Sequence, residues 1–296
     1  MNYSSAVASW QPAILTPPTA AGRFITLGLT RDANPRDVVA RVGALALDDR
    51  LILGVGEPLV RALGKQVDGL RAFPEIRGPG GAFPSTQGAV WLFLGGTDAG
   101  EILLRARRLI LSLGDCVRVD EDIPSFVYSG GHDLTGFEDG TENPKGERAV
   151  EVAFGTVPHR TGGCLVATQK WIHDLGGFER LSQKARNDVF GRDRESNEEL
   201  GSAPVSAHVK RAAQESYEPN AFLLRRSMPW GDVREHGLYF VAYAATLDSY
   251  ERILRRMAGL DDGIADALLS ISRAVTGGYF WCPPVLGDHL DLRALT

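Results

Sequence analysis

The 296-residue sequence has few cysteines and no apolar run long enough to cross a membrane. Its three cysteines, Cys116, Cys164 and Cys282, are widely spaced and form no CxxC pair, which argues against a disulfide framework and against a zinc site. We therefore expect reduced thiols that are buried as small apolar side chains. Residues 1–6 contain no basic segment, twin arginine or apolar segment, so we expect a cytoplasmic protein that binds no membrane.

Positive charge is not in excess either. The chain has 32 Lys and Arg against 37 Asp and Glu, a net charge of −5, whereas a protein that binds a phosphate backbone needs a basic surface. We therefore expect no nucleic-acid partner, and a neutral or cationic small substrate fits better. A hydrophobic content of 44% is enough for one large domain or two of ordinary size.

The stretch Gly136 to Pro144, GFEDGTENP, combines turn-forming residues with three carboxylates and a phenylalanine. Two glycines, a proline and an asparagine within nine residues predict a loop. Loops held on a rigid scaffold often carry catalytic groups. Taken alone, however, an ordinary turn explains this pattern better, so its meaning depends on residues further along the chain.

Two later segments accompany this loop: 206–211 (SAHVKR), with His208, and 223–229 (LLRRSMP), with Arg225. Together the three segments resemble the dye-decolourising peroxidases, a haem peroxidase family whose signature is a GxxDG loop, a downstream axial His and an Arg. The resemblance extends over about residues 22–279. The short separations between the segments resemble the compact B-type branch of the family.

The resemblance implies one haem b per chain and an enzyme that reduces hydrogen peroxide and oxidises dyes, phenols or other small organic reductants through a high-valent iron–oxo intermediate. It implies that His208 is the axial ligand of the iron. Asp139 is implied as the base that takes a proton from peroxide and returns it, and Arg225 as the cation that stabilises the developing charge and pairs with a haem propionate. Because a guanidinium lowers the pKa of a neighbouring carboxyl, we expect Asp139 to stay ionised in acid and the enzyme to work best at mildly acidic pH.

Other residues are assigned to the haem pocket by the same resemblance, and each has a plainer explanation. Leu223 and Phe240 align with its apolar lining, but both also fit an ordinary core. Ser227 stands where many B-type relatives carry Asn, which leaves its part in positioning water open. Asp266, in an apolar segment expected to be helical, is the candidate partner for the second ring nitrogen of His208, and a carboxylate on a helix surface explains it equally well.

Gly140 and Thr141 complete the assigned haem-binding set. Glu142 resembles an acidic residue near the haem edge of some relatives, and a metal site there is a further hypothesis. The other histidines have no comparable context and are interpreted as ordinary surface or core residues: His132, His159, His173, His236 and His289. Electrons from large dyes are expected to pass through a surface Tyr or Trp, and the sequence does not choose among examples such as Trp171, Tyr217, Trp230 and Tyr243.

Hydrophobic patterning predicts alternating strands and helices in both halves of the chain. In the first half, the expected strands span 23–29, 51–55, 89–94 and 116–120, the helices 35–47, 57–63 and 97–113, and an irregular loop 73–85. In the second half, strands at 163–168 and from 238, with helices at 175–190 and 246–255, repeat the pattern. We predict an α+β fold of two duplicated ferredoxin-like βαββαβ modules, 1–135 and 136–296, whose antiparallel sheets enclose a haem pocket. The family resemblance implies the same fold.

Two other functions stay open. One is a cytoplasmic haem-handling protein on the same fold, which stores haem, extracts its iron or acts as a haem-dependent dehydratase. The other is a ferredoxin-like binding module without a cofactor, in which 136–144 is only a turn. As partners we expect hydrogen peroxide, a small organic reductant and further copies of the chain. Some relatives are packaged into protein shells through a C-terminal extension, and the short segment after Tyr279 does not support that expectation here.

Overall fold

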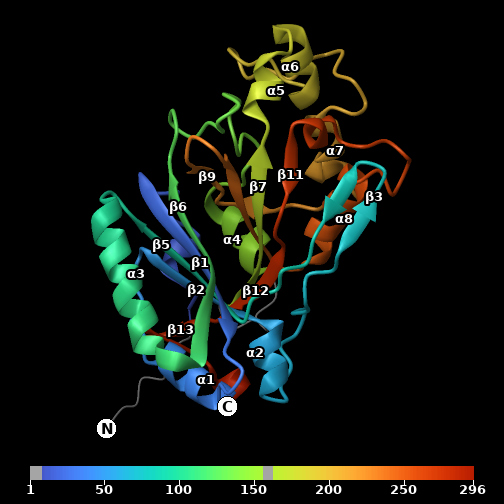
Figure 1. The fold of residues 1–296 in the computed structure, drawn as a ribbon. Coiled ribbons are helices and arrows are strands. Elements are labelled where there is room, and N and C mark those ends of the chain that lie inside the picture. Colours follow the sequence, from blue (N-terminus) through green and yellow to red (C-terminus); the bar gives the residue numbers. More distant parts are fainter. Residues whose placement is uncertain (1–8, 156–162) are drawn as a thin grey trace.

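The computed structural model describes residues 9–155 and 163–296, and its fold is α+β (Figure 1). His159, one of the histidines interpreted above as ordinary, lies outside the described residues. No helix within these two ranges is long and apolar enough to cross a membrane.

The first half forms a four-stranded antiparallel sheet in the order β2-β5-β1-β6. Asn34 begins the first helix and Asp98 the third, because each side chain accepts a hydrogen bond from a backbone N–H of the first turn. The helices and the sheet face they cover share one apolar core. The elements are β1 (Ala21–Leu29), α1 (Pro35–Gly43), β2 (Leu51–Gly56), α2 (Glu57–Ala62), β5 (Val90–Gly96), α3 (Ala99–Leu113) and β6 (Val117–Phe126).

The strands and helices predicted for this half are present, and their extents differ most at α1 and β6. Helix α1 ends at Gly43, and the buried Leu45 beyond it lies outside the helix. Strand β6 continues to Phe126, six residues beyond the prediction, because pairing with β1 satisfies its backbone through a polar stretch that hides the strand pattern.

The segment 73–85 was predicted to be irregular, and this is wrong in part. It contains a hairpin of β3 (Ile76–Gly78) and β4 (Gly81–Phe83). Gly81 has a φ of 140°, a conformation that residues with a Cβ rarely adopt, so glycine permits this tight turn.

The second half has the same strand order when β7 is matched to β1 and β10 to β5. The helix predicted over 175–190 is two helices, α5 and α6, because Ser182 caps a new helix by accepting a hydrogen bond from the N–H of Ala185. An origin of the two halves by duplication stays a prediction. The elements that build the site are α4 (Gly146–Phe154), β7 (Cys164–His173), α5 (Leu175–Glu179), α6 (Gln183–Phe190), α7 (His208–Arg211), β8 (Leu224–Arg225), β9 (Met228–Gly231), β10 (His236–Ala244), α8 (Asp248–Met257), η4 (Ala267–Ser270), β11 (Ser272–Ala274) and β12 (Gly278–Cys282).

The remaining elements are short. They are the 3-10 turns η1 (Pro12–Ile14), η2 (Gly114–Cys116), η3 (Gln214–Ser216) and η5 (Arg293–Leu295), and a hairpin of β13 (Val285–Leu286) and β14 (His289–Leu290).

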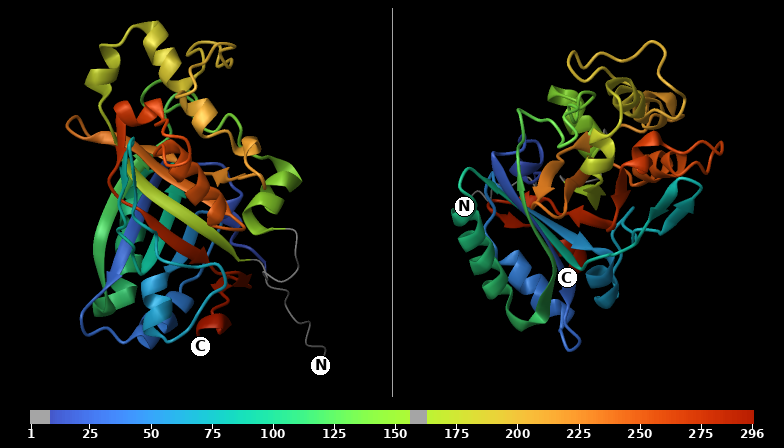
Figure 2. Two further views of the ribbon diagram at one scale, coloured as in Figure 1. Left: turned by 90° about the vertical axis from the view of Figure 1, so that its right-hand side faces the viewer. Right: turned by 45° about the horizontal axis from the view of Figure 1, so that its top comes forward.

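The two sheets join at both edges. Strand β6 of the first half pairs with β9 of the second, and β2 pairs with β12. Within the second half β7 pairs with β10, so the pairings form a closed ring of strands (Figure 2). Buried aromatic side chains contributed by both halves fill the space between the sheets, among them Phe24, Trp91, Tyr239, Tyr243 and Phe280. Helices α3 and α8 lie on opposite outer sides of the sheets (Figures 1 and 2). A ligand pocket therefore has to lie outside this shared core, and the prediction that the sheets enclose it is wrong.

Candidate active site

Two adjoining cavities lie against β7 and β10 and are bordered by α7 and the loop 136–144. Their volumes are about 470 and 90 Å³, and the larger is within the range that small-molecule and cofactor sites occupy. Residues that line both cavities include Asp139, His173, His208, Gln214, Arg225 and Leu238. The structure thus brings together the three residues assigned above to the catalytic centre.

The stretch 136–144 is a loop, as predicted. Gly136 and Gly140 have φ of 83° and 80°, which favour glycine, and a Cβ on Gly136 would lie 2.2 Å from Nη2 of Arg194. The N–H of Asp139 donates to the carbonyl of Gly131 at 3.1 Å. Gly140 and Thr141 both line the larger cavity.

Asp139 and Arg225 form an ion pair at this loop. Oδ1 of Asp139 lies 3.6 Å from Nη1 of Arg225, and the two side chains are 23% and 18% exposed. Asn143 joins their elements: its Nδ2 donates to the carbonyl of Arg225 at 2.7 Å, and its Oδ1 accepts from the N–H of Arg225 at 2.8 Å. The asparagine therefore fixes the loop that carries the acid against the strand that carries the cation. The sequence analysis placed Asn143 in the loop but gave it no part in the site.

The pKa of Asp139 lies above its usual value. Burial is the main cause and the nearby Asp133 carboxylate adds to it, while Arg225, His208 and the N–H of Gly140 act in the opposite direction. The expectation of a lowered pKa and an ionised carboxylate in acid is therefore wrong. Its reasoning counted the guanidinium and left out desolvation, which only the tertiary structure shows.

His208 is the first residue of α7, and its ring is held from one side. Nδ1 lies 2.7 Å from Oδ2 of Asp266, whose other oxygen accepts from the N–H of Leu268 at 2.8 Å. Asp266 is only 2% exposed, which contradicts the surface explanation for it. It also precedes η4 instead of lying within a helix as predicted, since Gly263, with a φ of 77°, interrupts the segment. In the described part of the chain, no hydrogen bond involves Nε2 of His208, so this nitrogen is free to bind a ligand.

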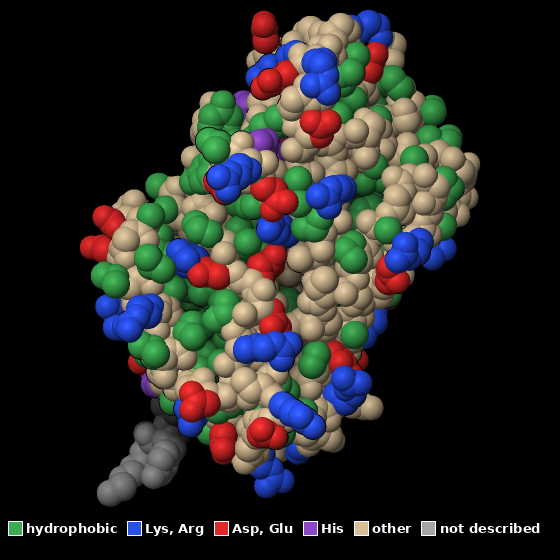
Figure 3. Space-filling model, viewed as in Figure 1, with side chains coloured by type: hydrophobic (Ala, Val, Ile, Leu, Met, Phe, Trp, Pro, Cys, Tyr) green, Lys and Arg blue, Asp and Glu red, His purple; other side chains and the backbone are tan. Residues whose placement is uncertain are grey.

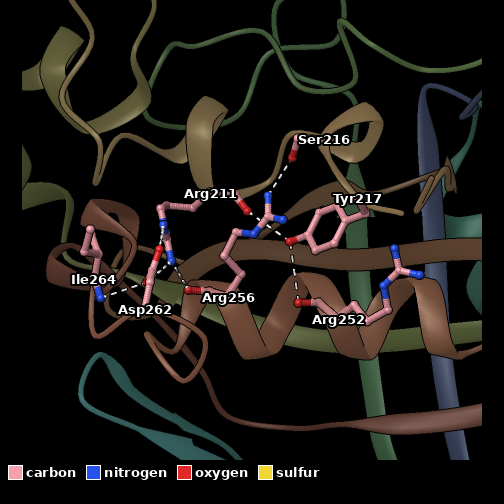
Figure 4. Close-up of polar contacts among 7 residues, drawn as sticks. All are labelled: Arg211, Ser216, Tyr217, Arg252, Arg256, Asp262 and Ile264. Atoms are coloured by element: carbon pink, nitrogen blue, oxygen red, sulfur yellow. Dashed lines mark hydrogen bonds and ion pairs between the residues drawn. The ribbon is translucent and has the colours of Figure 1, made fainter. Parts of the chain in front are cut away.

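Helix α7 has only four residues, so contacts with α8 and with the segment that follows α8 must hold it in place (Figure 4). Both terminal nitrogens of Arg211 donate to Asp262 at 2.7 Å, and Nη2 also donates to the carbonyl of Arg256 at 2.8 Å. Tyr217 donates to the carbonyl of Arg211 at 3.3 Å and packs its ring 3.6 Å from the guanidinium of Arg256. These contacts fix the turn from which His208 projects.

The apolar and polar residues assigned to the pocket separate in the structure. Leu223 and Phe240 line the smaller cavity. Ser227 accepts a hydrogen bond from the N–H of Val241 at 3.3 Å and is not among the described residues that line either cavity. The structure therefore does not bring Ser227 to the site.

Glu142 forms an ion pair with Arg192, at 3.0 Å between Oε1 and Nη2. Within residues 9–155 and 163–296, no three His, Cys, Asp or Glu side chains are placed to hold a metal ion, so the metal-site hypothesis finds no support there. Next to this pair, Nδ2 of Asn197 donates to Glu138 at 2.6 Å and to Thr141 at 3.0 Å. The segment that follows α6 thus covers the outer side of the loop.

His173 belongs to the site, although the sequence analysis interpreted it as ordinary. It is buried at the end of β7, lines both cavities and is hydrogen-bonded to Asp133 and Ser272. No motif surrounds it in the sequence, and a histidine at the end of a strand is also what a plain core position shows. Trp171 lines the smaller cavity, whereas the choice of an electron-relay residue stays open.

The family model described as "Dyp-type peroxidase, C-terminal" matches residues 131–286, which contain the loop, the histidine and the arginine. This chain belongs to the dye-decolourising peroxidase family. It is 31% identical to a dye-decolorizing peroxidase of Mycobacterium tuberculosis over 94% of this chain and 89% of that protein. As a member of this family, the protein is a peroxidase.

Solved structures agree. DyPB from Rhodococcus jostii has a TM-score of 0.83 and 30% identity, with 95% of this chain and 98% of that chain covered. A variant of the same DypB in complex with haem has a TM-score of 0.84 and 29% identity, with 97% and 100% covered. Membership of the B-type branch stays a prediction.

Proposed function

We propose that this peroxidase binds haem and reduces hydrogen peroxide with electrons from dyes, phenols or other small organic molecules. The observation that carries the proposal is the Asp139–Arg225 ion pair, which lines the same cavities as His208, the histidine whose Nδ1 is held by Asp266. The comparisons support it, since a structural relative is a haem complex. A cytoplasmic location and a homo-oligomeric state stay predictions.

The residues present fit a haem group. Nε2 of His208 is free at the cavity, while Nδ1 is engaged by Asp266. Nε of Arg225 is buried without a hydrogen-bond partner in the described part of the chain, which a propionate of the cofactor would supply. Leu223 and Phe240 offer apolar surface for the ring. None of the three cysteines lines either cavity, which supports a haem b held without thioether bonds. One haem per chain is part of the same proposal.

Bound haem supplies an iron centre that exchanges electrons with peroxide and with the organic reductant. Asp139, when ionised, accepts the proton of peroxide and returns it to the oxygen that leaves as water. Arg225 stabilises the negative charge that develops as the O–O bond lengthens. Asp266 accepts the Nδ1 proton of His208, which orients Nε2 toward the cavity and raises its basicity.

The haem-handling alternative uses His208 equally well. It gives no reason for a partly buried carboxylate paired with a guanidinium at the cavity, an arrangement that suits proton transfer and charge stabilisation in peroxide cleavage. The comparisons do not favour it, because the named relatives are peroxidases.

Purified protein reconstituted with haem tests the proposal. We expect a Soret band and dye bleaching that depends on both peroxide and haem. A Soret band without peroxide-dependent bleaching would favour haem handling, and no Soret band after added haem would favour the cofactor-free module. Arg225→Leu is the matched control, because it should keep the Soret band and lose most of the bleaching.

A further inference from the structure

A buried chain of polar groups connects the site to β11. Nε2 of His173 lies 3.0 Å from Oδ1 of Asp133, and Nδ1 of the same ring lies 2.7 Å from Oγ of Ser272. All three side chains are buried, and no step of the proposed reaction uses them. A buried carboxylate destabilises the fold unless it is ion-paired or hydrogen-bonded. The buried Asp133, His173 and Ser272 therefore call for a role.

Asp133 also holds the start of the loop 136–144 through hydrogen bonds of its own backbone. Its N–H donates to the carbonyl of Phe137 at 2.9 Å, and its carbonyl accepts from the N–H of Gly136 at 2.8 Å. Its second carboxylate oxygen accepts from the N–H of Thr135 at 2.9 Å. Through Asp133, His173 of β7 therefore anchors the turn that leads directly into Asp139.

The same carboxylate acts on Asp139 through its charge. Burial alone would raise the pKa of Asp133, but the hydrogen bond and charge of His173 and the hydrogen bonds of Thr135 hold it below its usual value. Asp133 is therefore ionised, and its negative charge raises the pKa of Asp139. The other groups that act on Asp139 are Arg225 on β8 and His208 on α7.

We propose that His173 and Asp133 form a positioning pair. The pair anchors the loop 136–144, which carries Asp139, and it holds the negative charge of Asp133 beside Asp139. Ser272 fixes the orientation of the imidazole from the far side. The anchoring is a property of the folded chain, whereas the effect on proton transfer rests on the proposed function of Asp139.

Hydrogen–deuterium exchange tests the anchoring without any turnover. In His173→Leu we expect faster exchange at the amides of Gly136 and Asp139, which donate within this loop. His173→Gln, whose side-chain N–H can still reach Asp133, should restore most of the protection. Unchanged exchange in His173→Leu would overturn the anchoring role, whatever the protein catalyses.

The reaction with peroxide tests the charge. We follow the first spectral change after mixing haem-loaded protein with hydrogen peroxide as a function of pH. The rate should fall at acidic pH as Asp139 becomes protonated, and this fall is the acid limb of the profile. Asp133→Asn removes a negative charge beside Asp139, so the acid limb should move to lower pH. His173→Leu leaves the Asp133 charge less compensated, so the limb should move to higher pH, with a rate about 10–100-fold lower because the acid is misplaced.

The control is Asp174→Asn, the same chemical change one residue from His173. The Asp174 side chain caps α5 and lines neither cavity, and Asn caps helices equally well, so the limb should stay in place. Opposite shifts in Asp133→Asn and His173→Leu support the pair. Shifts in the same direction, or no shifts, would overturn the electrostatic role of the pair. If the haem-loaded wild-type protein does not react with peroxide, the proposed function itself is refuted.

Discussion

At the scale of single residues, His208 differs from the other described histidines in its two nitrogens. One is engaged by a buried carboxylate and the other has no hydrogen-bond partner among the described residues. By contrast, His173 has both nitrogens engaged, and His236 lines neither cavity. Among the described histidines, His208 thus combines an oriented ring with an open nitrogen at the cavity, which supports its proposed part as the iron ligand.

We therefore expect His208→Ala to lose stable haem binding. Loss of an outer partner of a metal-binding His typically costs 10–100-fold in affinity, so loss of the ligand itself should cost more than roughly 100-fold. Haem titration followed at the Soret band measures this. His236→Ala is the matched control and should bind like wild type. An unchanged spectrum in His208→Ala would mean that another residue ligates the iron.

The contributions of Asp139 and Arg225 can be distinguished by the rate of the first spectral change after mixing with hydrogen peroxide. Asp139→Ala should slow it by roughly 10²–10⁴-fold, as is typical for a lost proton shuttle, although water can take over part of that role. Arg225→Leu should slow it by roughly 10²–10³-fold through lost charge stabilisation.

We expect Arg225→Leu to be at least as slow as Asp139→Ala. Removing the guanidinium also removes the main group that lowers the pKa of Asp139, so the remaining acid is less often ionised. Both variants should keep the Soret band. Wild-type rates in both would contradict the assignment of this cavity to peroxide cleavage.

At the scale of elements, β6 carries a half-buried carboxylate, Glu121. Glu121 pairs in register with Thr26 of β1, and burial raises its pKa to about 7, with Lys170 acting in the opposite direction. The unfolded chain ionises Glu near pH 4.3. Between these values the folded protein holds the proton of Glu121 more tightly than the unfolded chain does, so the contribution of this group to stability is fully present below about pH 4.3 and is lost as pH rises through about 7.

Glu121→Gln should therefore remove part of this pH dependence. We expect the free energy of unfolding of the variant, relative to wild type, to increase from pH 5 to pH 8, as measured by urea denaturation. Glu195→Gln, at an exposed position, is the control and should leave the pH dependence unchanged. Parallel curves for Glu121→Gln and wild type would show that the carboxylate is not held protonated by the fold.

At the scale of the whole molecule, the protein is acidic, and so is the larger of the two cavities at the site. Six carboxylates line that cavity against three Lys and Arg side chains. On the face drawn in Figure 3, acidic and basic side chains are interspersed, so this face has no broad basic surface that would attract anionic reductants instead. The field at the cavity should therefore attract cationic reductants.

We expect kcat/KM to be roughly tenfold higher for a cationic aromatic reductant than for an anionic one of equal potential at low ionic strength. The ratio should shrink toward one as salt rises, because the Debye length falls to about 10 Å at 0.1 M. Glu215→Gln, at an exposed position on the cavity lining, should reduce the ratio. A ratio that does not respond to salt would indicate oxidation away from this cavity.

The order of strands and helices and the loop 136–144 could be predicted from the sequence, because hydrophobic period and turn residues are local properties of the chain. The choice of His208, Asp139 and Arg225 rested on the family resemblance of their motifs, and the structure brings the three together at one pair of cavities. The closed ring of strands, which moves the cavity outside the sheets, could not be predicted. Neither could the parts of His173 and Asn143, whose partners lie 40 and 82 residues away. The raised pKa of Asp139 was missed for the same reason. Desolvation, edge-to-edge strand pairing and long-range hydrogen bonds depend on which distant residues meet, and only the tertiary structure decides that.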